Sequence, residues 1–319
     1  LFTYNTYNSF APGLSAWYGF LPGYGKNSLA GFMAYDFNNK NPVGGIRIFR
    51  ENNYFDMFHK QRWSVKLSSA EGRRGGSIGF SGTLKKPLTK TPISSIKTNI
   101  FYHNLIERAF DKTLYDEGKY FIGQFTFEKR WIINYFNDYS LGVEVHAGKG
   151  FLKGRIFGNY NLQIAKKIKT DIFISLDAFF NNSSVPQQYR NFIFGSVDPN
   201  FTALVINRTS INNDLKVLEN TYHGFGQKGV DPFNPKQSTI DPLLQFQLNQ
   251  SIPYLPGNIF FDVSSIISKN LFETNYISSG FELGPFIIPI YQSWGSEKSP
   301  DDVIWFRDKV RIKLPTINF

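Results

Sequence analysis

The sequence contains no cysteine, which excludes disulfide bonds and thiolate metal sites. Zinc could then be held only by histidine and carboxylate side chains that the fold brings together. The four histidines begin no His-Glu-x-x-His motif, so a zincin active site is excluded; they are His59, His103, His146 and His223. A Walker-type phosphate loop is also missing. We therefore expect this chain not to be an enzyme and to bind no cofactor or metal.

The sequence also lacks long hydrophobic runs. None approaches the roughly 18–20 apolar residues that a transmembrane helix requires. Yet 41% of the residues are hydrophobic, and 33 Phe and 17 Tyr make the chain rich in aromatics. Strands that expose every second residue to lipid produce this combination, because each strand is only half apolar.

Acidic residues are fewer than basic ones, 25 against 35, which gives a formal net charge of +10. Such a balance suits nucleic acid or an anionic membrane surface. The basic residues are scattered along the chain rather than clustered on a helix or arm, so we expect no nucleic-acid partner. We interpret them as lining a polar interior and facing lipopolysaccharide phosphates at its rim.

Alternation of polar and apolar residues is the main structural signal. Trp63, Val65 and Leu67 alternate with polar residues at 62, 64 and 66, and similar patterns occur at 155–164, 172–178, 244–249 and 259–264. A period of two indicates strands. Turn residues separate these segments and give about 16 strands. We predict an all-β fold: residues 1–319 form one antiparallel transmembrane β-barrel.

Two stretches depart from this pattern. Residues 181–242 form a long polar region, which we interpret as a large loop that is either extracellular or folded into the lumen. Pro315 lies in the last expected strand and cannot donate to a ladder, so we predict a bulge there.

Parity places many cations inside the barrel. They are Arg47, Arg62, Lys66, Lys97, Lys153, Arg155, Arg307, Lys309, Arg311 and Lys313. An open cationic lumen would favour anions. Alternatively, these side chains pair with Glu128, Glu144 and Asp177, or with a loop folded inside. Glu144 and His146 share a face, either as a metal or proton site or as two solvated interior side chains.

The last residues alternate as well: Phe306, Val310, Ile312 and Leu314 share one parity, and the four cations Arg307, Lys309, Arg311 and Lys313 share the other. The chain ends on the aromatic Phe319. In this it resembles bacterial outer-membrane β-barrel proteins, where the terminal aromatic is part of the signal read by the assembly machinery. The resemblance implies that the barrel assembly machinery is a partner.

Three pieces of the C-terminal third resemble the BamA-like superfamily of outer-membrane insertases and translocation pores. Residues 187–195 are similar to the strand leading into that family's long sixth loop, and 260–263 to a Phe-x-Asp-x strand. His223, Gly224 and Phe225 stand where the loop's Arg-Gly-Phe motif would fall. In the family this arginine pairs with an inward acidic residue. Histidine offers no bidentate fork, which puts insertase activity in doubt.

Residues 3–14 resemble the first strands of barrels that follow zinc aminopeptidase-type domains in Bacteroidota-like bacteria. Since the chain starts on Leu1 with no leader pattern, we expect it to be the C-terminal part of a longer protein. We predict that it lies in a bacterial outer membrane, in contact with lipid, lipopolysaccharide and other envelope proteins. It would anchor or assist an N-terminal domain in protein handling, and that domain could be a peptidase. A transport channel and a BamA-like insertase are the alternatives.

Overall fold

The computed structural model describes most of the chain. The described residues are 2–5, 9–20, 25–36, 41–53, 57–70, 73–84, 92–105, 116–134, 136–165, 168–193, 221–222, 238–251, 253, 257–267, 274–284, 286–294 and 311–313. Within these ranges the secondary structure is β, apart from one 3-10 turn, η1 (Gln187–Tyr189). None of the described helical residues forms a helix long and apolar enough to span a membrane. The all-β prediction is confirmed.

The strands follow one another along the chain. The first eleven are β1 (Phe2–Asn5), β2 (Ser9–Phe20), β3 (Gly25–Asp36), β4 (Asn41–Asn53), β5 (Phe58–Ala70), β6 (Arg73–Leu84), β7 (Ile93–Leu105), β8 (Gly118–Ile132), β9 (Asp138–Gly148), β10 (Phe151–Ala165) and β11 (Ile168–Asn181). The remaining strands are β12 (Asn191–Phe192), β13 (Thr221–Tyr222), β14 (Ser238–Thr239), β15 (Leu243–Ser251), β16 (Gly257–Ile266), β17 (Thr274–Leu283), β18 (Phe286–Trp294) and β19 (Arg311–Lys313).

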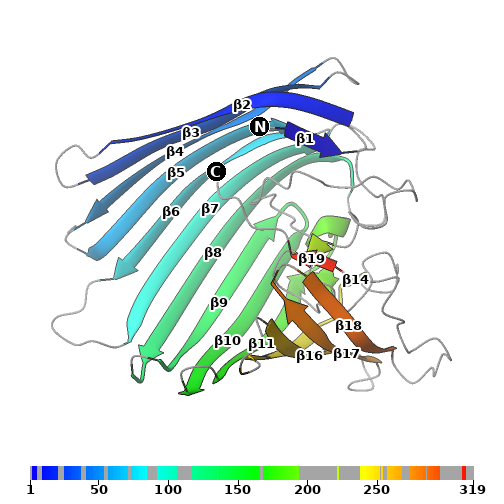
Figure 1. Ribbon diagram of the computed structural model, residues 1–319. Coiled ribbons are helices and arrows are strands. Elements are labelled where there is room, and N and C mark those ends of the chain that lie inside the picture. The colour runs from blue at the N-terminus through cyan, green and yellow to red at the C-terminus, as the bar shows by residue number, and fades with distance from the viewer. Residues whose placement is uncertain are drawn as a thin grey trace.

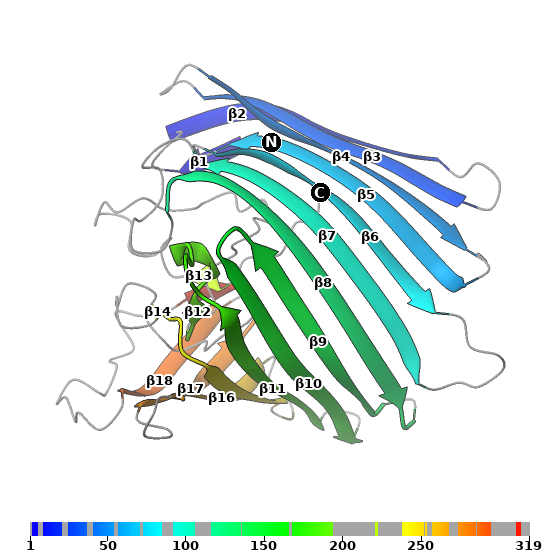
Figure 2. The same ribbon diagram turned by 180° about the vertical axis from the view of Figure 1, so that it is seen from behind.

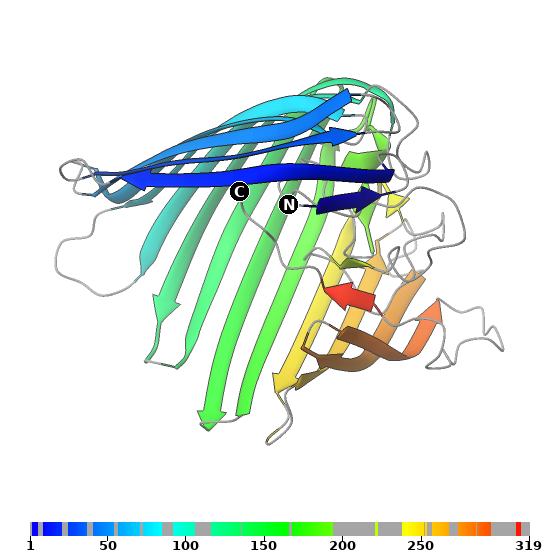
Figure 3. The ribbon, with the colours of Figure 1, turned by 45° about the horizontal axis from the view of Figure 1, so that its top comes forward.

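One antiparallel sheet holds nearly all of them. Each strand from β1 to β11 pairs with the next, β11 then pairs with β15, and the order continues to β19. The described part of this sheet has 17 strands, close to the number of about 16 expected from the sequence. This count includes the short β13, which pairs with β19 in parallel. The sheet curls round on itself (Figures 1 and 3). No pairing joins β1 to β19 within the described ranges.

The two faces of the sheet differ in chemistry, as alternation requires. On β5 the side chains of Trp63, Val65 and Leu67 are 50%, 42% and 57% exposed. The same outer face carries Ile156 on β10, 61% exposed. The inner face carries the intervening polar residues, and Asp177 there is 1% exposed. An apolar face that is exposed while the polar face is covered is the reverse of a soluble protein, and it fits a surrounding of lipid.

Aromatic side chains border this apolar face at both ends of the strands. Near one end, Tyr102 pairs with Phe121 on β8, and both are exposed. Near the other end, Trp131 stacks on Tyr139 with ring centroids 4.9 Å apart, and Tyr139 pairs with Tyr160. The ten residue-to-residue steps from Phe121 to Trp131 span about 33 Å along the strand, or about 25 Å across a membrane at a tilt of about 40°. This matches the apolar band and aromatic girdles of a membrane barrel.

Connections differ between the two ends of the sheet. At the end where β8 and β10 finish, the turn end, the connections have no more than eight residues. At the opposite end, the loop end, lie the long connections 106–117, 182–242 and 295–310. The back view in Figure 2 shows β8, β9, β10 and β11 running side by side between the two ends.

One expectation for the long connection is wrong in detail. Residues 187–195 do not form a strand leading out of β11: residues 187–189 form η1, and only Asn191–Phe192 is a strand, paired with β14. Pro186 precedes η1 with φ −60° and lacks an N–H, so the β11 ladder cannot continue through it. Residues 194–195 lie outside the described residues.

Candidate functional site: an ion-pair network on the inner wall

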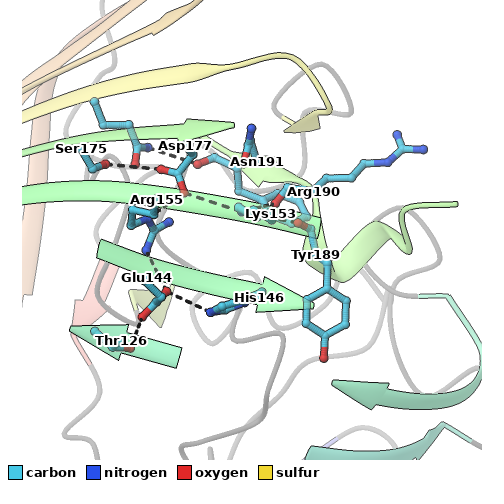
Figure 4. Close-up of polar contacts among 12 residues, drawn as sticks. Thr126, Glu144, His146, Lys153, Arg155, Ser175, Asp177, Tyr189, Arg190 and Asn191 are labelled. Atoms are coloured by element: carbon cyan, nitrogen blue, oxygen red, sulfur yellow. Dashed lines mark hydrogen bonds and ion pairs between the residues drawn. The ribbon is translucent and has the colours of Figure 1, made fainter. Parts of the chain in front are cut away.

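The densest polar cluster on the inner face lies where β8, β9, β10 and β11 pass side by side (Figure 4). The register sets Thr126 opposite Glu144, Glu144 opposite Arg155, and Arg155 opposite Asp177. Directly opposed side chains in an antiparallel sheet lie about 5 Å apart at Cβ, so alternating charges across the strands must interact. We call Glu144, His146, Lys153, Arg155 and Asp177 the inner-wall network.

Asp177 is the centre of this network. Arg155 donates from Nε to Asp177 Oδ1 at 2.7 Å, and Lys153 Nζ lies 3.8 Å from the same oxygen. Ser175 donates from its hydroxyl to Asp177 Oδ2 at 3.4 Å. With its side chain 1% exposed, this carboxylate has exchanged water for two cations and a hydroxyl. A buried charge is tolerated only when it is compensated in this way.

Glu144 forms the second anionic position. One carboxylate oxygen, Oε2, accepts hydrogen bonds from Gln124 at 3.1 Å and from Thr126 at 3.3 Å. The other oxygen lies 3.0 Å from Nε2 of His146 and 3.9 Å from Arg155. Two carboxylates therefore face two fixed cations, and the network is close to neutral.

The network also holds the start of the long connection between β11 and β15. Lys153 donates from Nζ to the backbone carbonyls of Tyr189 and Arg190, both at 3.4 Å. Asp116, two residues before β8, accepts from the amide of Gln187 at 2.8 Å, while its own amide donates to the side chain of Gln188 at 3.0 Å. The segment 185–193 is thus bonded both to Lys153 on β10 and to Asp116 before β8.

Apolar packing supports the same segment. The Tyr189 side chain is 2% exposed and packs with Phe101, Ile122 and Phe151, which lie on β7, β8 and β10. Its ring is stacked on Phe151, with centroids 5.1 Å apart. Burying an aromatic side chain contributes a large share of local stability, so Tyr189 fixes the segment on the inner face.

The far end of the segment is held by β15 and by Asp241, which lies between β14 and β15. Gln245 donates from Nε2 to the carbonyls of Phe192 and Ile193 at 3.2 and 3.4 Å. Asn191 donates from its side-chain amide to the carbonyl of Asp241 at 2.8 Å. Together these contacts place the segment 185–193 on the inner face between β8 and β15. The loop is therefore folded inward over its described beginning.

We expect Gln245→Met to weaken this attachment by about 1–2 kcal/mol, because two buried carbonyls lose their donor. The matched control is Gln247→Met, two residues along the same strand and the same face. A cysteine introduced at Val185 should react faster with a water-soluble maleimide in the Gln245→Met background than in the unchanged one. Equal reactivity in all three proteins would contradict the role of Gln245.

The contacts of the inner-wall network are ion pairs and hydrogen bonds between neighbouring strands. No group of three or more histidine, aspartate and glutamate side chains suited to a metal exists within the ranges described above. Glu144 and His146 do meet, but inside an ion-pair network. One motif was overlooked in the sequence: residues 75–79 match Gly-x-Ser-x-Gly. They lie inside β6, where Ser77 pairs with Lys66 and Phe101, and not on the strand-to-helix turn of a nucleophile elbow.

The structure accounts for some of the predicted residues. Arg47, Arg62, Lys66 and Lys97 share the inner register with Ser77 and Asn99, and Lys153 and Arg155 belong to the network. Asp262, in the predicted Phe-x-Asp-x strand, faces inward and is 0% exposed. Arg311 and Lys313 lie in β19, beside β18 and β13, although their side chains are outside the description.

Other predicted residues remain untested. Those outside the described residues are His223, Gly224, Phe225, Arg307, Lys309, Pro315 and Phe319. Tyr222, directly before the expected loop motif, pairs with Lys313 of β19. Their proposed roles stay predictions.

The described antiparallel sheet has an apolar outer face, aromatic borders and a polar inner face. This is the arrangement of a transmembrane β-barrel. No protein-family model matches the chain, and no curated protein matches it at a significant level. Among solved structures, it is similar to BamA from Haemophilus ducreyi lacking POTRA domains 1-3, at 11% identity and a TM-score of 0.46, covering 92% of this chain and 68% of that one.

A second similar structure is CdiB from Acinetobacter baumannii, at 9% identity and a TM-score of 0.44, covering 94% of this chain and 55% of that one. Both structures belong to the kind of barrel that the sequence resembles, but with TM-scores below 0.5 they count only as similar structures. Likeness of this degree concerns the course of the chain alone. The resemblance to barrels of zinc aminopeptidase-type proteins stays a prediction.

Proposed function

We propose that the chain is a β-barrel of a bacterial outer membrane that handles protein there, together with a domain outside residues 1–319. The observation that carries this proposal is the attachment of segment 185–193 to the inner wall. Part of the lumen beside β8–β15 is filled by the chain itself, held by Lys153, Tyr189 and Gln245. A lumen that is partly filled by the chain itself suits the controlled passage or insertion of a polypeptide better than free diffusion of solutes.

The ends of the sheet support an orientation. Outer-membrane barrels have short periplasmic turns and longer extracellular loops. The turn end would then face the periplasm and the loop end the cell exterior. β1 starts at Phe2, opposite Pro12 of β2, and runs towards the loop end. The chain therefore enters the sheet from the side of the turn end, so an attached N-terminal domain would lie in the periplasm, where unfolded envelope proteins and the assembly machinery are found.

A transport channel with a cationic lumen is the second candidate. Its support is the row of inward cations, but several of them have carboxylate partners. Arg62 lies 2.6 Å from Glu51, Arg130 lies 2.6 Å from Asp138, and Arg155 is bonded to Asp177. Charges compensated in pairs select weakly between anions and cations. These ion pairs leave an excess of positive charge only on the side of the lumen formed by β4–β7, and they therefore favour protein handling over anion transport.

Depletion of the protein from cells should separate the two candidates. We expect a defined set of outer-membrane or surface proteins to decrease in the envelope proteome, while small-solute uptake stays unchanged. In planar bilayers, the purified barrel should show a mostly closed state with rare large openings. An unchanged proteome together with a steady anion-selective current would contradict the proposal and support the channel.

A further inference from the structure

The inner faces of β4, β5 and β7 carry a second charged surface that the inner-wall network does not use. Register and parity place five cations there: Arg47, Lys60, Arg62, Lys66 and Lys97. We call them the cationic wall. Glu51 is the one carboxylate in the sequence of β4, β5, β6 and β7. Unlike the near-neutral network on β8–β11, this wall has a clear excess of positive charge.

Its cations are arranged in two rows. Arg47 pairs directly with Lys66, while Arg62 lies four residues from Lys66 along β5, opposite Glu51. Four residues of a strand span about 13 Å. The ring of Phe49 lies between the rows and contacts both guanidinium groups, 5.5 Å from Arg47 and 4.9 Å from Arg62. The aromatic ring packs against both guanidinium groups, and Arg62 also donates from Nε and Nη2 to Glu51 Oε2 at 3.1 and 2.6 Å.

Exposure distinguishes this wall from the inner-wall network. The side chains of Lys60 and Arg62 are 50% and 40% exposed, whereas the cations of the network, Lys153 and Arg155, are 13% and 18% exposed. Glu51 contacts Lys60 at 3.1 Å and Arg62 at 2.6 Å, so one carboxylate already binds in the way a ligand carboxylate would. The surface is accessible, cationic and shown by its own residue to accept a carboxylate.

We propose that the cationic wall binds acidic, extended segments of a polypeptide that enters the lumen. This rests on the proposed function and names the class of its substrate. Lipid headgroups are disfavoured because the wall lies on the face opposite Ile46, Ile48 and Trp63, which form the outer apolar surface. A single small anion reaches one row at a time, whereas an extended chain with carboxylates about four residues apart reaches both. Nucleic acid would need exposed aromatic faces for stacking, and Phe49 is covered by the arginines.

The test uses the purified chain in lipid nanodiscs and a fluorescent peptide with four Glu-Gly-Ser-Gly repeats. Binding is measured by anisotropy, with a peptide in which Gln replaces Glu as the uncharged probe. The variant Arg62→Gln with Lys66→Gln should weaken binding of the acidic peptide about tenfold, as expected for two partly exposed charges. The matched control is Arg50→Gln, on the outer face of β4, which should leave binding unchanged.

A second variant keeps the test decisive if the first folds poorly. Glu51→Gln removes the competing carboxylate and should tighten binding about threefold. Heat-modifiable migration in gels confirms that each variant is folded. The proposal is overturned if Arg50→Gln weakens binding as much as the double variant. It is also overturned if inorganic phosphate or oligothymidine competes as well as the acidic peptide at equal charge.

Because this assay uses the chain alone, a negative result for the cationic wall can be distinguished from a failure of the proposed function. Envelope proteins lost on depletion, without any binding of the acidic peptide, would remove this inference and leave the proposed function. Binding of the peptide without a depletion phenotype would leave the wall as an acidic-polypeptide site and remove the proposed function.

Discussion

Replacing Asp177 by alanine should destabilise the protein by about 3–5 kcal/mol, the largest effect we expect from a polar substitution. The substitution leaves Arg155 and Lys153 beside each other in the wall with Glu144 as the nearest anion, 3.9 Å from Arg155. The cost comes from the two uncompensated cations, because Asp177 is 1% exposed and water reaches it poorly. The measurement is the urea midpoint of unfolding in detergent micelles, followed by the heat-modifiable gel shift.

A control on the same strand makes this prediction specific. Asp171 also faces inward on β11, but its pair with Lys169 is exposed, 37% and 56% at the two side chains. Asp171→Ala should cost no more than about 1 kcal/mol. The double variant Arg155→Met with Asp177→Leu should recover part of the loss, since it removes a charge of each sign. Equal destabilisation by Asp177→Ala and Asp171→Ala would show that the network does not stabilise the wall.

Introducing a charge on the outer face should have the next largest effect. Ile156 lies near the middle of β10, 61% exposed, between Val143 and Leu176 on the neighbouring strands. In a bilayer, Ile156→Arg should cost about 2–4 kcal/mol, because the guanidinium is placed at the depth of the lipid tails. We expect a lower midpoint of unfolding in phospholipid vesicles and less folded protein in the outer membrane.

The comparison variant is Ile133→Arg, at the turn end directly after β8. Ile133 is 58% exposed, so the two positions are equally accessible and differ in depth. At the membrane interface an added arginine costs about 0–1 kcal/mol. Similar small effects of both substitutions would mean that the outer face is solvated by water rather than lipid.

The strands could be predicted from the sequence because one physical signal repeats in each of them. On β15, for example, Gln245 and Gln247 are buried while the intervening Phe246 is more exposed. Lipid outside and polar groups inside reverse the usual pattern, but the period of two remains. Inward parity was therefore readable for Arg155 and Asp177 from the sequence alone.

The pairing of charges was not readable, because parity gives a face and not a position along the neighbouring strand. Whether Arg155 meets Glu144, Asp177 or both depends on two hairpin registers, and a bulge such as the one between Leu152 and Lys153 shifts the register. Glu128, offered as a partner for the inward cations, pairs in register with Ser95 and Gly142 instead. The registers of β9, β10 and β11 are what identify Glu144 and Asp177 as the partners of Arg155.

The start of the long connection was mispredicted for a related reason. Gln187 and Gln188 look like strand residues in isolation, but they hydrogen-bond to Asp116, 71 and 72 residues earlier in the chain. Contacts of that separation leave no local pattern.

The most direct test of the central claim is a scan of β10 with single nitroxide labels in phospholipid vesicles. The chain has no cysteine, so each introduced cysteine at positions 152–163 is labelled uniquely. The barrel predicts that oxygen collides often with labels at even positions, including Leu152, Ile156 and Tyr160, and rarely with those at odd positions such as Arg155 and Asn159. Collision rates without a period of two, or high oxygen accessibility at the odd positions, would contradict a membrane barrel with the ion-pair network inside.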